Sequence, residues 1–313
     1  MTDLRSSGSV PIDIGSRLEL MVDDYLIARL SGDAQRRLNR PVPREVALVT
    51  DRPWEGNACG YFTIFQDGDI YRMYYNARQF ETSETSLSEP TGVTCYAEST
   101  DGINWVRPDL GLTQFNGSKN NNIIIDGENS NIPSSGFVPF KDTNPNVALD
   151  AKYKAWGKPA FFKTKEKPYF FIKGGASRKG HGPEVPDGLH ALKSPDGIRW
   201  TTLSDGPVIE DGLLDSLNLA FWDSVRGEYR DYHRNEFRID KTGEEPYSAH
   251  TVNGKPEASL RGSRYGRDMR TATSSDFIHW SEPEYINYTQ GRTDELYNNA
   301  IIPYFRAPHI FVG

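Results

Sequence analysis

Acidic side chains stand directly before predicted strands at three separate places in this sequence. Glu55 and Asp215 are single, whereas Asp294 and Glu295 are adjacent. Two carboxyl groups held close together can cleave a glycosidic bond, because one protonates the leaving oxygen while the other attacks the sugar carbon or activates water. A third carboxylate often holds a hydroxyl group or tunes a pKa. Glu55, Asp215 and Glu295 are therefore candidate catalytic residues and Asp294 a candidate binding residue, although an acid before a strand is equally common as a turn or capping residue.

Aromatic and basic side chains near these positions are candidates for binding a substrate. Trp54 and Tyr297 could stack on the apolar face of a sugar ring. Arg306 and His309 could bind a sugar hydroxyl group or a phosphate. These four residues extend the candidate site from the carboxylates to a binding surface.

Three further candidates come from one predicted strand. His233 and Arg234 lie on it, and Glu236 follows just beyond them. They could reach toward the carboxylates and bind the substrate, or they could form a solvated strand edge, which is the more frequent position of such residues.

Composition argues against several other classes of function. The 313 residues include 36 Lys and Arg against 43 Asp and Glu, with a net charge of −7 and no basic run, so no nucleic-acid surface is expected. The apolar runs are too short for a membrane span, which needs about 18 residues. Neither a metal nor a cofactor is expected, because the six histidines lack ligand spacing, Cys59 and Cys95 are the only cysteines, and no nucleotide-binding loop occurs. The start shows no secretory signal, so a cytoplasmic location and a trimmed signal of a periplasmic or secreted protein both stay open.

A seven-residue pattern occurs three times and positions these candidates. Residues 99–105, 194–200 and 274–280 all read Ser-x-Asp-x-Ile-x-Trp, and each follows a short alternating strand. An aspartate at this place caps the backbone amides of a tight turn, while Ile and Trp anchor the returning strand. A repeated turn residue cannot serve one unique active site, so a structural role is predicted for Asp101, Asp196 and Asp276.

Around each turn the sequence predicts one four-stranded antiparallel sheet, which is the blade of a β-propeller. Residues 1–16 are expected to be a disordered or extended tail, and residues 17–313 an all-β partial propeller of about three blades. Residues 297–313 read as the first strands of a fourth unit. Because an open propeller leaves unpaired sheet edges, the missing strands are expected from a longer protein or from another chain.

The repeat and its surroundings resemble a known superfamily. The turn at 274–280, with the preceding strand 267–273, resembles the blade signature of the five-bladed propeller glycosidases, which include invertases, levansucrases, arabinanases and β-xylosidases. Residues 21–27, 52–55 and 215–223 are similar to an uncharacterised bacterial branch related to the N-terminal domain of glycoside hydrolase family 32, the invertase family.

This resemblance implies a five-bladed propeller whose innermost strands line a central funnel, with the substrate-binding acids at or just before those strands. It places Glu55, Asp215 and Glu295 at the funnel as carboxylates of a glycoside hydrolase. It also implies an oligosaccharide or polysaccharide as substrate. The invertase motifs Asn-Asp-Pro-Asn, Arg-Asp-Pro and Glu-Cys are absent, so fructosidase activity is not part of the expectation.

Two alternatives stay open from the sequence. A phosphorylase on the same scaffold needs one carboxylate and a cluster of basic residues such as Arg234, Arg306 and His309. A propeller that binds glycans without cleaving them is the other alternative, because propellers host many functions.

Overall fold

The computed structural model describes residues 11–82, 87–88, 92–127, 130, 132–158, 188–214, 216–238, 251–252, 255–256, 265–287 and 296–313. The chain divides into two compact units, Ala47–Ala300 and a second unit made of Met1–Val46 with Ile301–Gly313. Within the described residues the helical structure is one 3-10 turn, Leu149–Ala151. None of the described helical structure is long and apolar enough to cross a membrane. The prediction of an all-β protein is confirmed.

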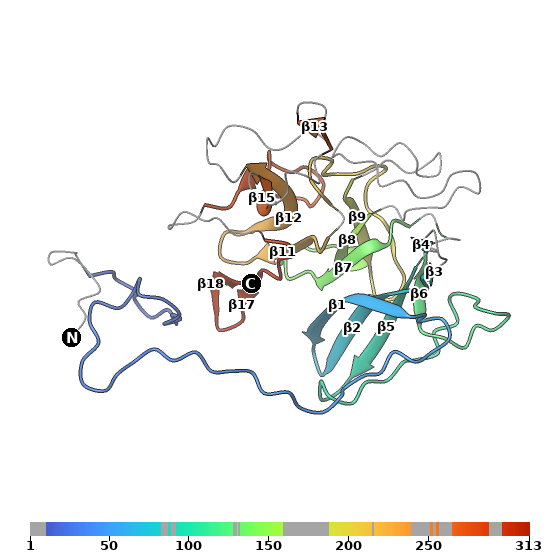
Figure 1. Ribbon diagram of the computed structural model, residues 1–313, viewed down its shortest axis with the longest axis horizontal. Coiled ribbons are helices and arrows are strands. Elements are labelled where there is room, and N and C mark those ends of the chain that lie inside the picture. The colour runs from blue at the N-terminus through green and yellow to red at the C-terminus, as the bar shows by residue number, and fades with distance from the viewer. Residues whose placement is uncertain are drawn as a thin grey trace. The chain divides into compact units, whose positions relative to one another are not determined.

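The larger unit contains three four-stranded antiparallel sheets, named blades 1, 2 and 3 in chain order (Figure 1). Blade 1 has the order β1 (Ala58–Asp67), β2 (Ile70–Arg78), β5 (Val93–Ser99) and β6 (Ile123–Asp126). Blade 2 consists of β7 (Ser135–Lys141), β8 (Tyr153–Lys158), β9 (His190–Ser194) and β10 (Thr201–Thr202). Blade 3 consists of β11 (Leu219–Asp223), β12 (Glu228–Arg238), β15 (Tyr265–Ser274) and β16 (Glu284–Tyr285).

Short two-stranded pairs complete the strand inventory of the described residues. They are β3 (Glu81–Thr82) with β4 (Leu87–Ser88), β13 (Thr251–Val252) with β14 (Lys255–Pro256), and β17 (Ile302–Tyr304) with β18 (Ala307–Val312). The first two pairs interrupt the connections between the second and third strands of blades 1 and 3, and the last pair belongs to the smaller unit.

Consecutive strands pair within each blade, so the predicted four-stranded antiparallel units are confirmed and are consistent with a β-propeller. The tight turn between β1 and β2 illustrates how the sequence makes such a pair, since Asp67 lies opposite Ile70 and Gly68 adopts a φ of +63°. A total of five blades and an incomplete propeller stay predictions, as do the boundaries at residues 16 and 17.

The three repeated turns have the predicted structure. The Oδ1 atom of Asp101 accepts hydrogen bonds from the backbone amides of Ile103 (2.8 Å) and Asn104 (2.7 Å). Asp196 and Asp276 make the same pair of bonds in their own turns, each at 2.8 Å. Each turn follows the third strand of its blade, far along the sheet from the innermost strand. The structural role of the three aspartates is therefore confirmed.

The turn of blade 2 is held by the second strand of blade 1. The hydroxyl group of Tyr74 donates a hydrogen bond to the carbonyl oxygen of Gly197 at 3.0 Å, and Arg72 Nη1 donates to the Asp196 carbonyl oxygen at 2.9 Å. Tyr74 also meets Trp200 edge to face, with ring centroids 6.5 Å apart. We use the term seat for the place where the second strand of one blade contacts and holds the turn of the next blade.

Asp67 accepts hydrogen bonds from three donors, and two of them, Lys141 and Tyr153, belong to blade 2 and so join it to blade 1. Its carboxylate accepts from Arg72 Nε at 2.5 Å, Lys141 Nζ at 2.5 Å and the Tyr153 hydroxyl group at 2.6 Å. Burial alone would raise the pKa of Asp67, but the hydrogen bonds from Lys141, Tyr153 and Arg72 outweigh it and lower the pKa to about 2. Burial, followed by the bond to Asp67, raises the pKa of Tyr153 to about 12.

The turn of blade 3 sits on the second strand of blade 2 in a different way. Phe277 occupies the position of the turn glycines and keeps their left-handed backbone, with a φ of +69°. Its buried ring stacks on Trp156 with centroids 4.5 Å apart and meets Tyr229 edge to face at 5.3 Å. The second seat is therefore apolar, where the first is hydrogen-bonded.

Candidate functional site

The residues just before each innermost strand are here called the lead-in segment, and in blades 1 and 3 this segment is hydrogen-bonded to the second strand of the same blade. In blade 1 the Asn57 amide donates to the Arg78 carbonyl oxygen at 3.1 Å, and in blade 3 the Leu213 amide donates to the Arg234 carbonyl oxygen at 2.9 Å. A side chain at Gly56 would collide with the Arg78 carbonyl group. The lead-in segments of blades 1 and 3 therefore each contact the second strand of their own blade.

This contact shows which acids correspond between blades. Glu55 lies two residues before Asn57, and Asp211 lies two residues before Leu213, each followed by a glycine. Asp211 is 68% exposed and forms an ion pair with Arg270. Sequence reasoning missed Asp211, although the acid–glycine pair before the strand was a signal that could have found it.

Asp215 itself lies outside the described residues, as do Asp294 and Glu295. The neighbours of Asp215 are well anchored, because Leu214 and Ser216 are both buried. The amide of Asn218 donates hydrogen bonds to the carbonyl oxygens of both neighbours, at 2.9 Å and 3.1 Å. The lead-in segment of blade 3 is thus fixed on both sides of Asp215.

Glu55 is fully buried and engaged on both carboxylate oxygens. Its Oε1 atom lies 2.9 Å from Arg107 Nε and accepts a 2.5 Å hydrogen bond from Tyr75, while Oε2 accepts from the Arg52 amide at 2.9 Å. Burial raises the pKa of the Tyr75 phenol, and the bond to Glu55 raises it further, so Tyr75 stays a donor. In this structure Glu55 closes the turn of its lead-in segment and neutralises Arg107.

Trp54 packs against blade 1. Its indole Nε1 donates to Asn122 Oδ1 at 2.7 Å, and its ring meets Phe115 edge to face with centroids 6.2 Å apart. Asn122 in turn donates to the Tyr75 hydroxyl group at 3.0 Å, which links Trp54 to the surroundings of Glu55. Both residues therefore belong to one buried polar network.

His233 forms a buried pair with Asp231. Both are fully buried on β12, and His233 Nδ1 lies 2.5 Å from Asp231 Oδ2. Trp156 of blade 2 donates its indole hydrogen to Asp231 Oδ1 at 2.8 Å. Arg234 is buried as well, so the interpretation as a solvated strand edge is wrong for His233 and Arg234. The sequence analysis missed Asp231 and Trp156, although the Asp-x-His spacing places both side chains on one face of a strand.

Among the buried polar side-chain atoms that have no hydrogen-bond partner within the described part of the chain, three lie in or beside the lead-in segments of blades 2 and 3. They are Asn76 Oδ1 on β2, Ser216 Oγ in the lead-in segment of blade 3, and His233 Nε2 on β12. The amide of Asn76 donates to the Ser134 carbonyl oxygen at 3.3 Å, and a side chain at Gly136 would come within 3.5 Å of the Ser216 carbonyl oxygen. All three atoms therefore lie near the lead-in segments of neighbouring blades.

Such atoms are unusual, because buried polar groups in proteins are almost always paired. An amide oxygen accepts hydrogen bonds, whereas a serine hydroxyl group and an imidazole nitrogen can donate or accept. Each of the three atoms therefore has unused hydrogen-bonding capacity within the described residues.

Tyr297 and Arg234 are brought together as candidate binding residues. The guanidinium groups of Arg234 and Arg267 each lie 4.9 Å from the centroid of the Tyr297 ring. The Leu296 amide donates to the Arg267 carbonyl oxygen at 2.8 Å, which holds this segment beside β15. Glu236 lies opposite Arg267 in the register of β12 and β15.

Arg306 and His309 belong to the smaller unit. Arg306 is exposed beyond β17, with its guanidinium group 5.2 Å from the Phe305 ring. His309 Nε2 lies 3.2 Å from Glu19 Oε1 within the same unit. Among the described residues no group of three or more His, Cys, Asp or Glu side chains could hold a metal ion.

Comparison with known proteins finds similarity only among solved structures. No family model matches the chain, and no curated protein matches it either. The similarity to the invertase-related branch therefore stays a prediction.

Among the solved structures, the chain is similar to a glycosyl hydrolase from Bacteroides ovatus, with 16% identity over 76% of this chain and 51% of that chain and a TM-score of 0.36. It is similar to an N-acetylgalactosamine deacetylase from F. plautii in complex with blood group B trisaccharide, with 12% identity over 70% and 50% of the two chains and a TM-score of 0.36.

A third similar structure comes from the GH130 family of mannoside phosphorylases, which contains glycoside hydrolases that target β-1,2 mannosidic linkages. It shows 13% identity over 81% of this chain and 55% of that chain, with a TM-score of 0.35. The chain spans about half the length of these structures. All three are carbohydrate-active proteins, and TM-scores this low carry no argument about the fold or activity of this chain.

Proposed function

We propose that this chain belongs to a carbohydrate-active enzyme, a glycoside hydrolase that acts on an oligosaccharide or polysaccharide at the lead-in segments. The observation that carries the proposal is the set of three buried, unpartnered atoms, Asn76 Oδ1, Ser216 Oγ and His233 Nε2, close to acidic lead-in segments. Sugar hydroxyl groups can satisfy all three, and the acids supply proton transfer.

In this proposal Asp215 is the first carboxylate and Glu295 the second. Asp215 follows a buried leucine and precedes Ser216, one of the unpartnered groups. Glu55 is the third carboxylate. Its direct participation requires that it exchange the bonds to Tyr75 and Arg107 for substrate.

His233 contributes to substrate binding through Nε2. Its Nδ1 atom is fixed by Asp231, which Trp156 holds in place. A side chain at Gly212 would come within 3.0 Å of His233 Cδ2, so only the smallest residue can cover the imidazole here. We assign Asp231 and Trp156 as positioning residues for His233.

Turnover by the Asp215→Asn variant tests the hydrolase proposal. Aryl glycosides and plant or algal polysaccharides are screened with the unaltered chain, and the substrate that is cleaved is then used for the variants. The expected loss is about 10²- to 10⁴-fold, the usual contribution of a general acid or base. Asp205→Asn, at an exposed loop aspartate, is the matched control and should keep full turnover. A variant at Asp215 that cleaves at the normal rate contradicts the proposal.

A phosphorylase is the second candidate function. It is favoured by two guanidinium groups that lie close to the Tyr297 ring. Arg234 and Arg267 stand on the same side of β12 and β15 and could bind a phosphate. Turnover that depends on inorganic phosphate would support this alternative. Glycan binding with no turnover of any substrate, unchanged when Asp215, Glu295 and Glu55 are replaced together, would support a binding protein instead.

A further inference from the structure

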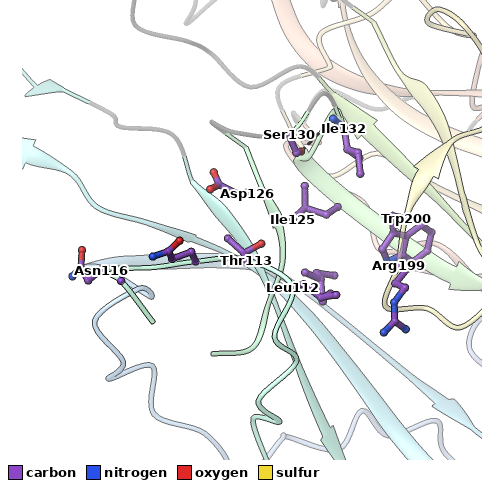
Figure 2. Close-up of a pocket in the computed structure, with 12 residues that line it drawn as sticks. Leu112, Thr113, Asn116, Ile125, Asp126, Ser130, Ile132, Arg199 and Trp200 are labelled. Carbon is purple, nitrogen blue, oxygen red and sulfur yellow. Dashed lines mark hydrogen bonds between the residues drawn. The ribbon is translucent and has the colours of Figure 1, made fainter. Parts of the chain in front are cut away.

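A cavity of about 760 Å³ lies between blades 1 and 2 and is lined by β6, the hairpin before it, Ser130 and Ile132 ahead of β7, and the end of the blade 2 turn (Figure 2). One side is formed by β6, the outermost strand of blade 1, together with the hairpin that precedes it. The other side is formed by Arg199 and Trp200, at the end of the turn of blade 2. None of the candidate catalytic residues lines it.

The hairpin side of the cavity is rigid. Asn116 and Gly117 form a two-residue turn with φ of +48° and +83°, closed by mutual backbone bonds between Phe115 and Ser118 at 2.8 Å and 3.0 Å. The buried side-chain amide of Asn121 fixes the base of the hairpin, because it donates a hydrogen bond to the Thr113 carbonyl oxygen at 2.9 Å. Asn116 is thereby held at the rim of the cavity.

The opposite side is equally fixed. Trp200 is buried and donates its indole hydrogen to Gly197 at 3.1 Å, within the turn that is seated on blade 1. Arg199 Nη1 donates to Asp196 Oδ2 at 2.8 Å, which orients the guanidinium group at the rim. Both walls are therefore formed before any ligand arrives, as is usual for binding sites.

The lining follows the edge of β6 and is polar above an apolar floor. Ile124, Ile125 and Asp126 are consecutive, and since neighbouring strand residues point to opposite faces, a cavity that touches all three runs along the strand edge. The register with β5 skips Ile124, which is a bulge. In Figure 2 Ile125 lies among the lining residues, with Thr113 and Asp126 on one side of it.

We propose that this cavity is a second binding site, for a neutral oligosaccharide. A sugar ring has an apolar face, which fits the aliphatic floor, and hydroxyl groups that both donate and accept. Asn116 and Thr113 can do both, Asp126 accepts, and Arg199 donates. The charge of Arg199 is already paired with Asp196, so the lining does not favour an anionic ligand. The inference concerns a separate surface and goes beyond the proposed hydrolase.

Calorimetric binding of four neutral hexasaccharides tests this site: cellohexaose, xylohexaose, mannohexaose and arabinohexaose. Asp215→Asn serves as the parent, so that the ligand is not consumed. Asn116→Gly keeps the left-handed backbone but removes the amide, and is expected to weaken binding about 2- to 10-fold, the effect of one or two hydrogen bonds. Leu112→Trp fills the cavity and should abolish binding at this site, while any binding at the lead-in segments is kept.

Asn120→Ala is the matched control, because Asn120 is exposed on the same hairpin and does not line the cavity. It should bind like the parent, and melting curves check that every variant is folded. The inference is overturned if none of the four sugars binds, or if Asn116→Gly and a folded Leu112→Trp bind like the parent. An extended valine–threonine peptide could instead pair with the edge of β6 as an added strand. The inference is also overturned if such a peptide binds and the sugars do not displace it. Because binding is read without turnover, failure of the hydrolase proposal leaves this measurement unaffected.

Discussion

Replacing Asp67 with Asn should destabilise the contact between blades 1 and 2 in a pH-dependent way. Asp67 is 9% exposed and accepts hydrogen bonds from Arg72, Lys141 and Tyr153. Its pKa falls from 3.8 to about 2, a difference of about 1.8 units. At about 1.4 kcal/mol for each unit of pKa, this corresponds to about 2 kcal/mol. Because Lys141 is 45% exposed, solvent screening reduces the expected contribution to about 1–2 kcal/mol.

The sign follows from the depressed pKa. Above pH 3.8 Asp67 is ionised in both the folded and the unfolded chain, so its contribution to stability is fully present. As the pH falls through 3.8 toward 2, the unfolded chain takes up the proton first and the contribution is lost. The difference in unfolding free energy between the natural chain and Asp67→Asn should therefore shrink by about 1–2 kcal/mol between pH 7 and pH 2.

Urea unfolding at a series of pH values measures this difference. Other low-pKa groups cancel, because both proteins contain them. Asp69→Asn is the matched control, since Asp69 lies in the same turn and is exposed. The reasoning is refuted if the two stability curves stay parallel from pH 7 to pH 2, or if Asp69→Asn costs as much as Asp67→Asn.

Three other substitutions test the packing and the site. Phe277→Gly relieves the left-handed backbone, worth about 1–2 kcal/mol, but loses a buried ring worth about 3–5 kcal/mol, so denaturant unfolding should show a net loss of about 1–4 kcal/mol; a more stable variant would contradict the apolar seat. Glu55→Gln should lower the unfolding free energy by about 1–3 kcal/mol, because it removes the buried carboxylate that accepts from Tyr75 and pairs with Arg107, which keeps its ion pair with the exposed Asp51; a variant with normal stability and abolished turnover would make Glu55 catalytic. Trp156→Phe removes the donor to Asp231 and should raise the KM more than it lowers the kcat, while His233→Gln does the same more strongly; equal effects on both constants would argue against positioning.

The repeated parts of this fold could be predicted from the sequence. Each Ser-x-Asp turn is a local structure whose donors and acceptor lie within five residues, so its geometry follows from the residue types alone. The same holds for the alternating strands on either side of it. Local patterns of this kind identify a blade, and repetition identifies an array of blades.

The partners of the candidate site residues could not be predicted, because they come from distant parts of the chain. Arg107 lies 52 residues after Glu55, and Trp156 lies 75 residues before Asp231. Asp211 was missed for a different reason. β1 begins one residue after the Asn57 contact, whereas β11 begins six residues after the corresponding contact of blade 3. An acid chosen by its distance from the start of the strand is therefore not the one that corresponds to Glu55.

The contacts that hold the turns make the blades depend on one another in chain order. The turn of blade 2 needs Tyr74 of blade 1, and the turn of blade 3 needs Trp156 of blade 2, so each blade depends on the one made before it. Blade 1 is different, because a side chain at its turn residue Gly102 would meet Tyr71 of the same blade. Synthesis proceeds from the N-terminus, so every newly made turn finds its support already folded. In an array built this way, the order of the blades along the chain is tied to the side chains on the second strand of each preceding blade.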